Sequence, residues 1–444
     1  MESTVAALGS RTMHLVALRL APQHCNTVRK ALSQYVLKTR RVKPIQNDGA
    51  HPGHKLLLLN EDVSRGGVEL DGLPSALRDV AMSHGAKAVA HTVEVGFDNL
   101  TVAQALRELL PASIPDDRVP SSFETIGHIA RLVLHPEHLP YRYEIGKVFL
   151  AKNSRLRTVV NKTSSISTQF RTFPMEVIAG DDDMEAEIKE NDATFTFDFS
   201  KVYWNSRLQR EHARIVDSLA DEDIVCDMMA GIGPFAVPAA LRSGATIYAN
   251  DLNPDSHRAL VRNVRRNGVG KSVTCSNLDA REFARDLMQR KIPFTRVLMN
   301  LPDSAISFLD VFAEKLAAWP LRSGPPWPTV HCYCFSSAEG KDAQVMDVKQ
   351  RVEDVLKVPL TEGEWSVHFV RDVAPRKMML CITFVLPVSA HAIAPAGTGA
   401  GADAGAGAGA VVGAVVGADA DADADAGDAV GDAAPARKRH KGLP

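Results

Sequence analysis

The stretch that decides the fold is CDMMAGIGPF, residues 226–235, which lies between an apolar run and a helix-like segment. It holds Gly231 and Gly233, two glycines separated by one residue. Glycine has no Cβ, so a strand-to-helix turn built from it can bring its backbone close to a ligand. Turns of this kind hold several classes of ligand, and the surrounding residues must distinguish among them.

Apolar runs alternate with helix-like segments around this turn. From Asp223 onward they read DIVCDMM, ATIYAND, SVTCSNLD, TRVLMN, TVHCYCFS and WSVHFV, and a further long run, KMMLCITFVLP, follows. This alternation predicts an α/β fold with a doubly wound parallel sheet. Ligands of such sheets bind outside the carboxyl ends of the strands, so the residues that end each strand are the informative ones.

Acidic and amide side chains end the strands that follow the glycine turn. The second strand ends at Asp251, 18 residues beyond Gly233, and the third and fourth end at Asp279 and Asn300. A carboxylate at the end of the second strand can accept hydrogen bonds from a ribose diol. The series therefore predicts a site for a nucleoside at this edge of the sheet.

The glycine turn itself disfavours a ligand that is held by its phosphates. Ala236 stands where a dinucleotide fingerprint needs its third glycine, and Pro234 removes a backbone N–H that a phosphate would use. A nucleoside without a phosphate fits better, and S-adenosylmethionine presents one. A single GxG and one aspartate also occur by chance in α/β proteins, but the ordered series of four strand ends favours the cofactor.

A helix-like segment upstream, YWNSRLQREHARIVDSL (203–219), carries a carboxylate on its apolar stripe. Glu211 lies three residues after Leu208 and four before Ile215, so it faces the interior. There it must be paired or must act with a raised pKa. An ion pair with Arg214 or Arg207 is the structural alternative to a catalytic role.

Composition indicates a globular protein of two or three domains. The 444 residues carry a formal net charge of −2, so any surface for nucleic acid must be a local patch. The first 47 residues hold eight Lys or Arg and one acid, which indicates either a basic face of the first domain or a mitochondrial transit segment.

No Cys or His cluster has metal-ligand spacing, and no apolar run approaches the ~20 residues of a membrane span.

The chain divides into a head (1–112), a middle segment (113–195), a large C-terminal unit (196–388) and a tail (389–444). In the head, HKLLLLN (54–60) predicts a strand and NLTVAQALRELLP (99–111) a helix. The tail is rich in Ala, Gly and Asp, which predicts disorder, and it ends with the basic cluster RKRHK (437–441) of a nuclear import signal. The two termini together predict a protein shared among nucleus, cytoplasm and mitochondrial matrix.

Several segments in a fixed order resemble one family. They are IGHIARL, FDFSKVYWNSRL, the following EH, DMMAGIGPF, NDLNP, NLD, MNLP and RDVAPRKMMLCITF. Over residues 14–387 the chain is similar to the tRNA (guanine-37-N1)-methyltransferases of eukaryotes and archaea. The resemblance implies a class I methyltransferase domain with a Rossmann-like sheet, preceded by two smaller α+β RNA-binding domains. It further implies a monomer that uses S-adenosylmethionine to methylate N1 of guanosine 37 of tRNA, which supports reading-frame maintenance.

The same resemblance gives roles to individual residues. Glu211 would be the general base, and Arg171 in STQFRTF would contact guanine O6. Asn300 would be a third catalytic residue. The cofactor contacts would be His212, Asp251, Leu252, Asp279, Ala280, Asn300, Gly231 and Gly233. These roles suit the chemistry, because guanine N1 must lose a proton before it becomes a nucleophile and charge then builds on O6. No metal is implied.

Two other functions stay open at this point. A related enzyme of the wybutosine pathway moves the aminocarboxypropyl group of the same cofactor onto a tRNA guanosine, but it resembles only the C-terminal part of this chain. A tRNA-binding protein without activity is the second alternative, although it would not need four acceptor-bearing strand ends. Methylation of an amino group is disfavoured, because MNLPD lacks the aromatic side chain that would stack on a flipped base.

Overall fold

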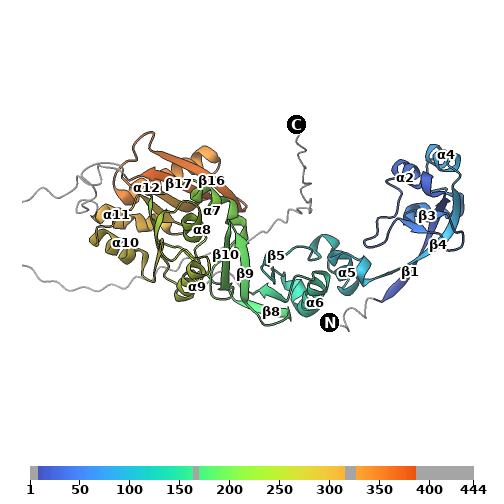
Figure 1. Cartoon of the computed structure of the whole chain (residues 1–444), viewed down its shortest axis with the longest axis horizontal. Helices are drawn as coiled ribbons and strands as arrows, with labels where there is room; N and C mark the ends of the chain where they lie inside the picture. Colours follow the sequence, from blue (N-terminus) through green and yellow to red (C-terminus); the bar gives the residue numbers. More distant parts are fainter. Residues whose placement is uncertain (1–8, 164–169, 316–326, 387–444) are drawn as a thin grey trace, which may run out of the picture. The chain divides into compact units, whose positions relative to one another are not determined.

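The computed structural model describes residues 9–163, 170–315 and 327–386, and these form two compact units (Figure 1). The first unit contains the described residues up to 125 together with 129–162 and 176–183. The second contains residues 126–128, the described part of 163–175, and the described residues from 184 onward. The tail predicted to be disordered and its RKRHK cluster lie outside the described residues.

The first unit starts with a four-stranded sheet in the order β2-β3-β1-β4. Its elements are β1 (Ser10–Leu20), α2 (Pro22–Ala31), β2 (Ile45–Asn47), β3 (Lys55–Leu58), α3 (Glu61–Ser64), η1 (Gly67–Glu69), α4 (Ser75–Ser83) and β4 (Lys87–Gly96). β3 confirms the strand predicted over 54–60. The second half of β1 is buried on both faces, because Val16 and Leu18 belong to one apolar cluster and Leu15 and Ala17 to another.

A second sheet of the first unit, in the order β5-β6-β7-β8, has an apolar core of its own. The elements are η2 (Phe97–Asn99), α5 (Val102–Leu109), η3 (Asp116–Arg118), β5 (Glu124–Ile126), β6 (Ile129–Leu132), η4 (Pro136–Tyr141), α6 (Arg142–Lys152), β7 (Thr158–Lys162) and β8 (Met175–Gly180). α5 confirms the helix predicted over 99–111, and it starts where the Thr101 hydroxyl accepts a hydrogen bond from the N–H of Gln104. Leu106 of α5 packs in the same cluster as Ile145 of α6, so this core begins ahead of residue 112.

The second unit is built on a seven-stranded sheet in the order β13-β12-β11-β14-β15-β17-β16 (Figure 1). Its strands are β11 (Ile224–Asp227), β12 (Thr246–Asn250), β13 (Val273–Ser276), β14 (Arg296–Met299), β15 (Thr329–Ser336), β16 (Trp365–Ala374) and β17 (Lys377–Val385). Six of them lie within the segments predicted as strands, and β16 starts in WSVHFV (365–370) but continues to Ala374, so the α/β class is confirmed. β11 to β15 pair in parallel, whereas β17 is antiparallel to β15 and β16. The short turn between Ala374 and Lys377 imposes this change, because a hairpin joins only antiparallel strands.

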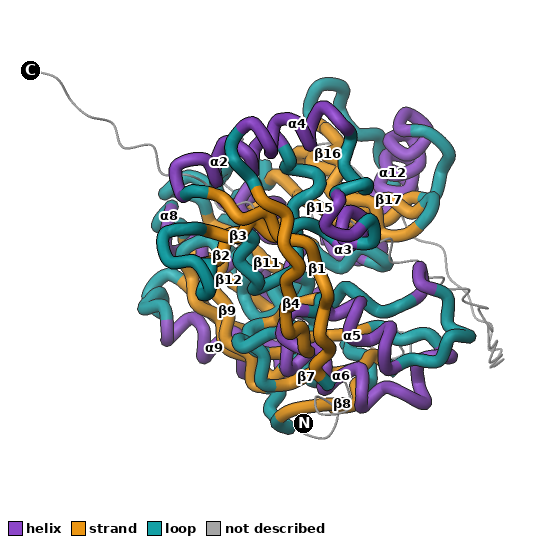
Figure 2. Tube along the Cα trace, turned by 90° about the vertical axis from the view of Figure 1, so that its right-hand side faces the viewer, coloured by secondary structure: helices purple, strands orange, loops and turns teal. Residues whose placement is uncertain are grey.

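Helices accompany the strands in both units (Figure 2). Those of the second unit are η5 (Ser206–Leu208), α7 (Gln209–Val216), α8 (Ala236–Arg242), α9 (Pro254–Arg266), α10 (Ala280–Gln289), η6 (Ala305–Leu309), α11 (Asp310–Lys315) and α12 (Lys341–Leu356). Phe283 of α10, Phe312 of α11 and Val352 of α12 share one apolar cluster with the strands. The helix predicted over 203–219 is shorter, because the Asn205 side chain accepts the N–H of Arg207 at 3.1 Å and starts η5 there.

A hairpin of β9 (Glu185–Glu190) and β10 (Ala193–Asp198) also belongs to the second unit. The side-chain amides of Asn263 on α9 and of Asn267, the residue that caps the end of α9, hold it. Asn263 accepts the N–H of Thr196 at 2.8 Å, and Asn267 accepts the N–H of Thr194 at 2.9 Å. The sequence assigned this hairpin largely to the middle segment (113–195), whereas its hydrogen bonds join it to the methyltransferase-like unit.

Three further features concern the described residues alone. No helix among them is long and apolar enough to cross a membrane. The six cysteines, all of which are described, are unpaired. Within the same ranges, no group of three or more His, Cys, Asp or Glu side chains is arranged to hold a metal ion.

Candidate active site

The glycine turn connects β11 to α8, and both glycines have a left-handed backbone. φ is +55° at Gly231 and +98° at Gly233, values that residues with a side chain adopt rarely. A Cβ on Gly231 would meet nothing within 4 Å, whereas a Cβ on Gly233 would come within 2.8 Å of Leu260 Cδ1. Gly231 therefore leaves space for a ligand, and Gly233 allows α9 to pack against the turn.

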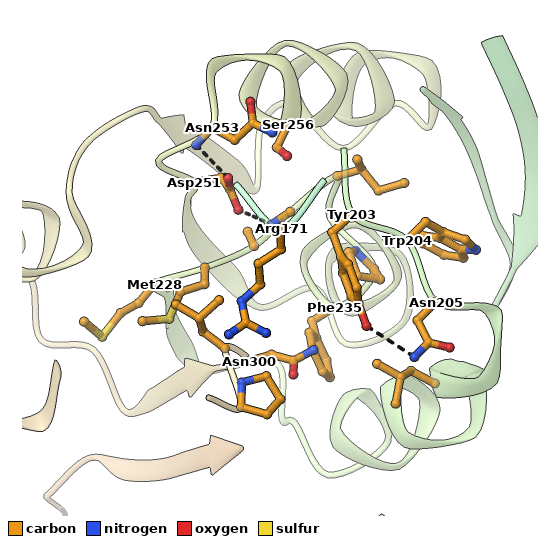
Figure 3. Close-up of a pocket in the computed structure, with 18 of the residues that line it drawn as sticks. Arg171, Tyr203, Trp204, Asn205, Met228, Phe235, Asp251, Asn253, Ser256 and Asn300 are labelled. Carbon is orange, nitrogen blue, oxygen red and sulfur yellow. Dashed lines mark hydrogen bonds between the residues drawn. The ribbon is translucent and has the colours of Figure 1, made fainter. Parts of the chain in front are cut away.

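A pocket of about 200 Å³ lies at the carboxyl ends of the parallel strands (Figure 3). The residues with predicted roles that line it are Arg171, His212, Gly231, Asp251, Leu252, Asp279, Ala280 and Asn300. Glu211 and Gly233 are not among the lining residues. The fold thus gathers residues from distant segments at the edge of the sheet where α/β proteins bind their ligands.

Asp251 joins the end of β12 to the glycine turn. Its Oδ2 accepts a hydrogen bond from the N–H of Gly231 at 2.8 Å, and its Oδ1 accepts one from the N–H of Asn253 at 2.9 Å (Figure 3). Burial raises the pKa of Asp251 to about 6. Each carboxylate oxygen keeps a further lone pair, so Asp251 can also accept hydrogen bonds from ligand hydroxyls.

Asn250, which the sequence did not single out, fixes three chain segments around the pocket. Its buried Nδ2 donates to the carbonyls of Met228 at 3.1 Å and Leu278 at 3.0 Å. Its Oδ1 accepts the N–H of Leu278 at 2.9 Å. One amide therefore holds the segments that follow β11 and β13 against the end of β12. The signal in the sequence was a second polar residue directly before Asp251.

The next strand end leads straight into a helix. Asp279 caps α10 by accepting the N–H of Arg281 at 2.9 Å, and Ala280 is the first residue of that helix. Leu252 also lines the pocket, and 40% of its surface is exposed. The carbonyl of Leu252 accepts a hydrogen bond from Asn277 Nδ2 at 3.1 Å, which connects the loops after β12 and β13.

Asp227, the last residue of β11, is a second feature that the sequence analysis missed. It is fully buried, and neither of its carboxylate oxygens makes a well-formed hydrogen bond with the described residues. Burial, and then the nearby charge of Asp251, raise the pKa of Asp227 to about 8. Buried carboxyls of this kind cluster at functional sites. In the sequence, Asp227 is visible only as the polar end of an apolar run.

Arg171 reaches the pocket from the segment between β7 and β8. Its backbone is left-handed, with φ at +57°, and its side chain is 20% exposed. The guanidinium pairs with Asp303 in the loop after β14, and Lys377 Nζ lies 3.9 Å from the other oxygen of that carboxylate. Figure 3 shows the Arg171 side chain inside the pocket, with Asn300 at its guanidinium end in this view. An RNA acceptor would have to displace Asp303 to engage Arg171 fully.

His212 forms a rigid wall of the pocket. Its Nδ1 lies 2.5 Å from Oε1 of Glu190 on β9, and both side chains are buried. Its ring packs edge-on against Phe235 with a centroid distance of 4.7 Å. The hydrogen bond and the ring contact together fix the orientation of the imidazole.

Glu211 lies beside the pocket on α7. It precedes His212 and follows Leu208 by one helical turn, and both of these neighbours line the pocket. The side chain is 6% exposed. Its carboxylate accepts hydrogen bonds from Arg214 (Nε to Oε2, 2.8 Å; Nη2 to Oε1, 2.5 Å) and from the Tyr333 hydroxyl (2.8 Å). The ion pair that was the structural alternative is thus present, with Arg214 as the partner.

Aromatic and apolar side chains that carried no predicted role complete the pocket wall. They include Phe170, Tyr203, Trp204, Phe235, Phe308, Phe335, Val373 and Met379. Tyr203 is 41% exposed, and its hydroxyl accepts a hydrogen bond from Asn205 Nδ2 at 3.3 Å (Figure 3). Arg371 also lines the pocket, and like Val373 and Met379 it comes from the hairpin of β16 and β17. The family-like segment RDVAPRKMM was the one sequence signal for that contribution.

The lining fits S-adenosylmethionine. Asp251 and Asp279 provide acceptors at neighbouring strand ends, and the missing side chain of Gly231 leaves space where a nucleoside can approach the backbone. Pro234, which has no N–H, also lines the pocket, so this turn is poorly suited to phosphate. Apolar walls with a few convergent polar groups are usual for sites of this size and ligand class.

Two family models match the chain. The TRM5/TYW2 methyltransferase domain matches residues 186–319, which include the glycine turn and the ends of β11 to β14. The TYW2 N-terminal domain matches residues 106–183, which correspond to most of the sheet of β5 to β8 and its helices.

Solved structures share the fold. WT Trm5b from Pyrococcus abyssi gives a TM-score of 0.59 at 23% identity, covering 84% of this chain and 99% of that one. The complex of aTrm5 and tRNALeu gives a TM-score of 0.59 at 21% identity, covering 84% and 100%. At these identities the likeness shows the fold alone.

Curated relatives extend the match over most of the chain. The tRNA (guanine(37)-N(1))-methyltransferase of Phytophthora infestans (strain T30-4) is 46% identical over 391 residues, which are 86% of this chain and 92% of the relative. The protein of the same name from Dictyostelium discoideum is 38% identical over 380 residues, which are 85% and 80%. On this identity and coverage, the chain belongs to the family of tRNA (guanine(37)-N(1))-methyltransferases.

Proposed function

We propose that this protein transfers the methyl group of S-adenosylmethionine to N1 of guanosine 37 of tRNA and thereby supports reading-frame maintenance. The observation that carries the proposal is the pocket, in which Asp251, Asp279 and Asn300 at three strand ends share one cavity with Arg171. Relatives that are 46% and 38% identical over most of the chain bear the name of this activity.

When bound here, S-adenosylmethionine supplies an electrophilic methyl group carried by a sulfonium. Asp251 would hold the ribose hydroxyls, since its oxygens keep lone pairs after accepting the N–H groups of Gly231 and Asn253. Asp279, Ala280 and Leu252, which line the same pocket, would contact the rest of the nucleoside. The apolar wall excludes water, which strengthens the polar contacts.

Glu211 removes the N1 proton, because guanine N1 bears a proton at neutral pH and is no nucleophile until it is lost. Leu208, the last residue of η5, and His212, next to Glu211 on α7, line the pocket, and we propose that rotation of the Glu211 side chain moves its carboxylate from Arg214 to the pocket. Arg171, once released from Asp303, stabilises the charge that builds on O6. Asn300 lies at the same end of the pocket and helps to orient the base.

The substrate partner of the chain is tRNA with guanosine at position 37, and we assign its recognition to the first unit. We further propose that the chain works as a monomer. Its distribution among nucleus, cytoplasm and mitochondrial matrix is proposed from two sequence features, the basic N-terminal region and RKRHK (437–441).

Aminocarboxypropyl transfer is the second candidate, and the TYW2 N-terminal domain model that matches residues 106–183 is the observation in its favour. The relatives named for N1 methylation outweigh it, because they align over 92% and 80% of their own lengths. A protein that only binds tRNA would not need the acceptors that line the cofactor pocket.

One experiment separates these functions. The full chain is incubated with unmodified tRNA transcript and cofactor labelled either in the methyl group or in the aminocarboxypropyl group, and the digested RNA is mapped by mass spectrometry. We expect 1-methylguanosine at position 37, with no transfer to a transcript that carries adenosine there. Transfer of the label in the aminocarboxypropyl group would show that the chain is an aminocarboxypropyltransferase. Binding of tRNA without transfer of either label would mean that the chain is a tRNA-binding protein without activity.

A further inference from the structure

The contacts of Glu211 come from three different elements. Arg214 lies on the same helix, Tyr333 on β15 and His368 on β16. Arg214 and Tyr333 donate hydrogen bonds to the carboxylate, and His368 Nε2 lies 3.4 Å from Glu211 Oε2. Tyr333 is fully buried, whereas the His368 side chain is 47% exposed. His368 therefore connects the buried carboxylate to solvent.

Only one of these neighbours can take a proton from Glu211. Arg214 keeps its proton, because the adjacent carboxylate raises the pKa of its guanidinium further. Tyr333 keeps its hydroxyl proton, because burial raises its pKa well above 10. Cys381, directly opposite His368 on β17, also stays protonated, since burial raises the pKa of its thiol to about 12. Among the described groups around Glu211, only the His368 ring carries a nitrogen lone pair that can take up a proton.

We propose that His368 accepts the proton that Glu211 takes from guanine N1 and releases it to solvent. The inference rests on the proposed function, in which Glu211 is the base. The N1–H bond breaks as the proton passes to Glu211, and the N1 electron pair forms the bond to the methyl carbon as the carbon–sulfur bond breaks. The proton then moves from Glu211 Oε2 to His368 Nε2, the ring loses its Nδ1 proton to water, and proton exchange with solvent moves the remaining proton from Nε2 back to Nδ1, so that Nε2 can accept again.

Arg214 and Tyr333 act as positioning residues in this scheme. Their hydrogen bonds hold Glu211 within reach of His368 between turnovers, since both contacts are to the same carboxylate. His368 does not line the pocket, so it acts through Glu211 without contact with the substrate. Removal of the His368 side chain should therefore slow the return of Glu211 to its charged form more than it slows the first methyl transfer.

The test compares first-turnover and steady-state rates of the full chain on tRNA transcript. His368→Ala is expected to keep most of the first-turnover rate and to lose about tenfold to a hundredfold in steady-state turnover. Added imidazole should restore that turnover in proportion to its concentration and leave wild type unchanged. The matched control is Ser366→Ala, which changes an exposed residue two positions earlier on β16 and should behave as wild type.

Two outcomes would overturn the proposal. If steady-state turnover of His368→Ala equals that of wild type, the proton leaves by another route. If both rates fall together and imidazole restores neither, His368 only holds Glu211 in place. Glu211→Gln separates this from failure of the proposed function, because normal methylation by that variant would remove Glu211 as the base. Melting curves and cofactor binding establish that each variant is folded.

Discussion

The carboxylate of Asp251 and the backbone N–H of Gly231 are joined by a hydrogen bond of 2.8 Å, so the acceptor that we propose for the ribose and the glycine turn form one unit. Asp251→Ala should lose both the ribose contact and the tether of the turn. We expect S-adenosylmethionine binding to weaken by about 1.5 to 3 kcal/mol, the range for a hydrogen bond to a charged group. Titration calorimetry measures this change, and Asp251→Asn should keep part of the affinity. Unchanged affinity in Asp251→Ala would remove Asp251 from the cofactor site.

Glu211→Gln should lower the single-turnover methylation rate by about two to four orders of magnitude, the usual contribution of a positioned general base. Glutamine keeps the shape and a hydrogen-bond acceptor for Tyr333, so binding of tRNA and cofactor should survive. A variant that melts far below wild type, or that reacts within a few-fold of it, would make the pair with Arg214 purely structural.

Asp303→Asn should free Arg171 from its ion pair in the absence of RNA. Because the Asp303 side chain is 51% exposed, the pair costs the incoming RNA only about 1 kcal/mol or less. We therefore expect kcat/KM for tRNA to rise by about twofold to fivefold, mainly through a lower KM. The control is Asp286→Asn, which breaks the exposed pair between Asp286 and Arg290 on α10. A fall in kcat/KM would show instead that Asp303 holds Arg171 in its working position.

Asp227 should make stability depend on pH. Its pKa of about 8 in the folded chain lies above the ordinary 3.8, so the unfolded chain releases this proton first as pH rises. Asp227 therefore stabilises the fold fully below pH 3.8, and this contribution is lost as pH rises through about 8. Asp227→Asn stays uncharged, so its free energy of unfolding should exceed that of wild type by about 1 to 3 kcal/mol above that pH. Denaturant titrations without cofactor test this, and parallel pH curves for the two proteins would contradict it.

The strand ends could be predicted because their signals are local. Asp251 and Asp279 each follow an apolar run and precede a helix start, so the sequence alone places both side chains at one edge of the sheet. Gly231 and Gly233 look alike in the sequence, and only the position of Leu260 shows that one faces the ligand space and the other faces a helix.

The surroundings of Glu211 could not be predicted. The apolar stripe of its helix indicated burial, but Tyr333 and His368 come from strands that are far away in sequence, and their place depends on the strand order. The reversal of β17, which brings Met379 to the pocket wall, depends on the same order. Pairing between distant strands is set by the whole core, and a single sequence carries no local signal for it.

The double-sided burial of β1 limits where the chain tolerates proteolytic trimming. β1 pairs with β3 on one side and β4 on the other, and its register with β4 starts at Ser10. A cut within Ser10–Leu20 would leave β3 and β4 with unpaired edges, which are prone to aggregate. A cut ahead of Ser10 spares every pairing that the described residues make in this sheet. None of the eight Lys or Arg of the first 47 residues lies ahead of Ser10, so a chain trimmed there would keep its folded head and every one of these basic side chains.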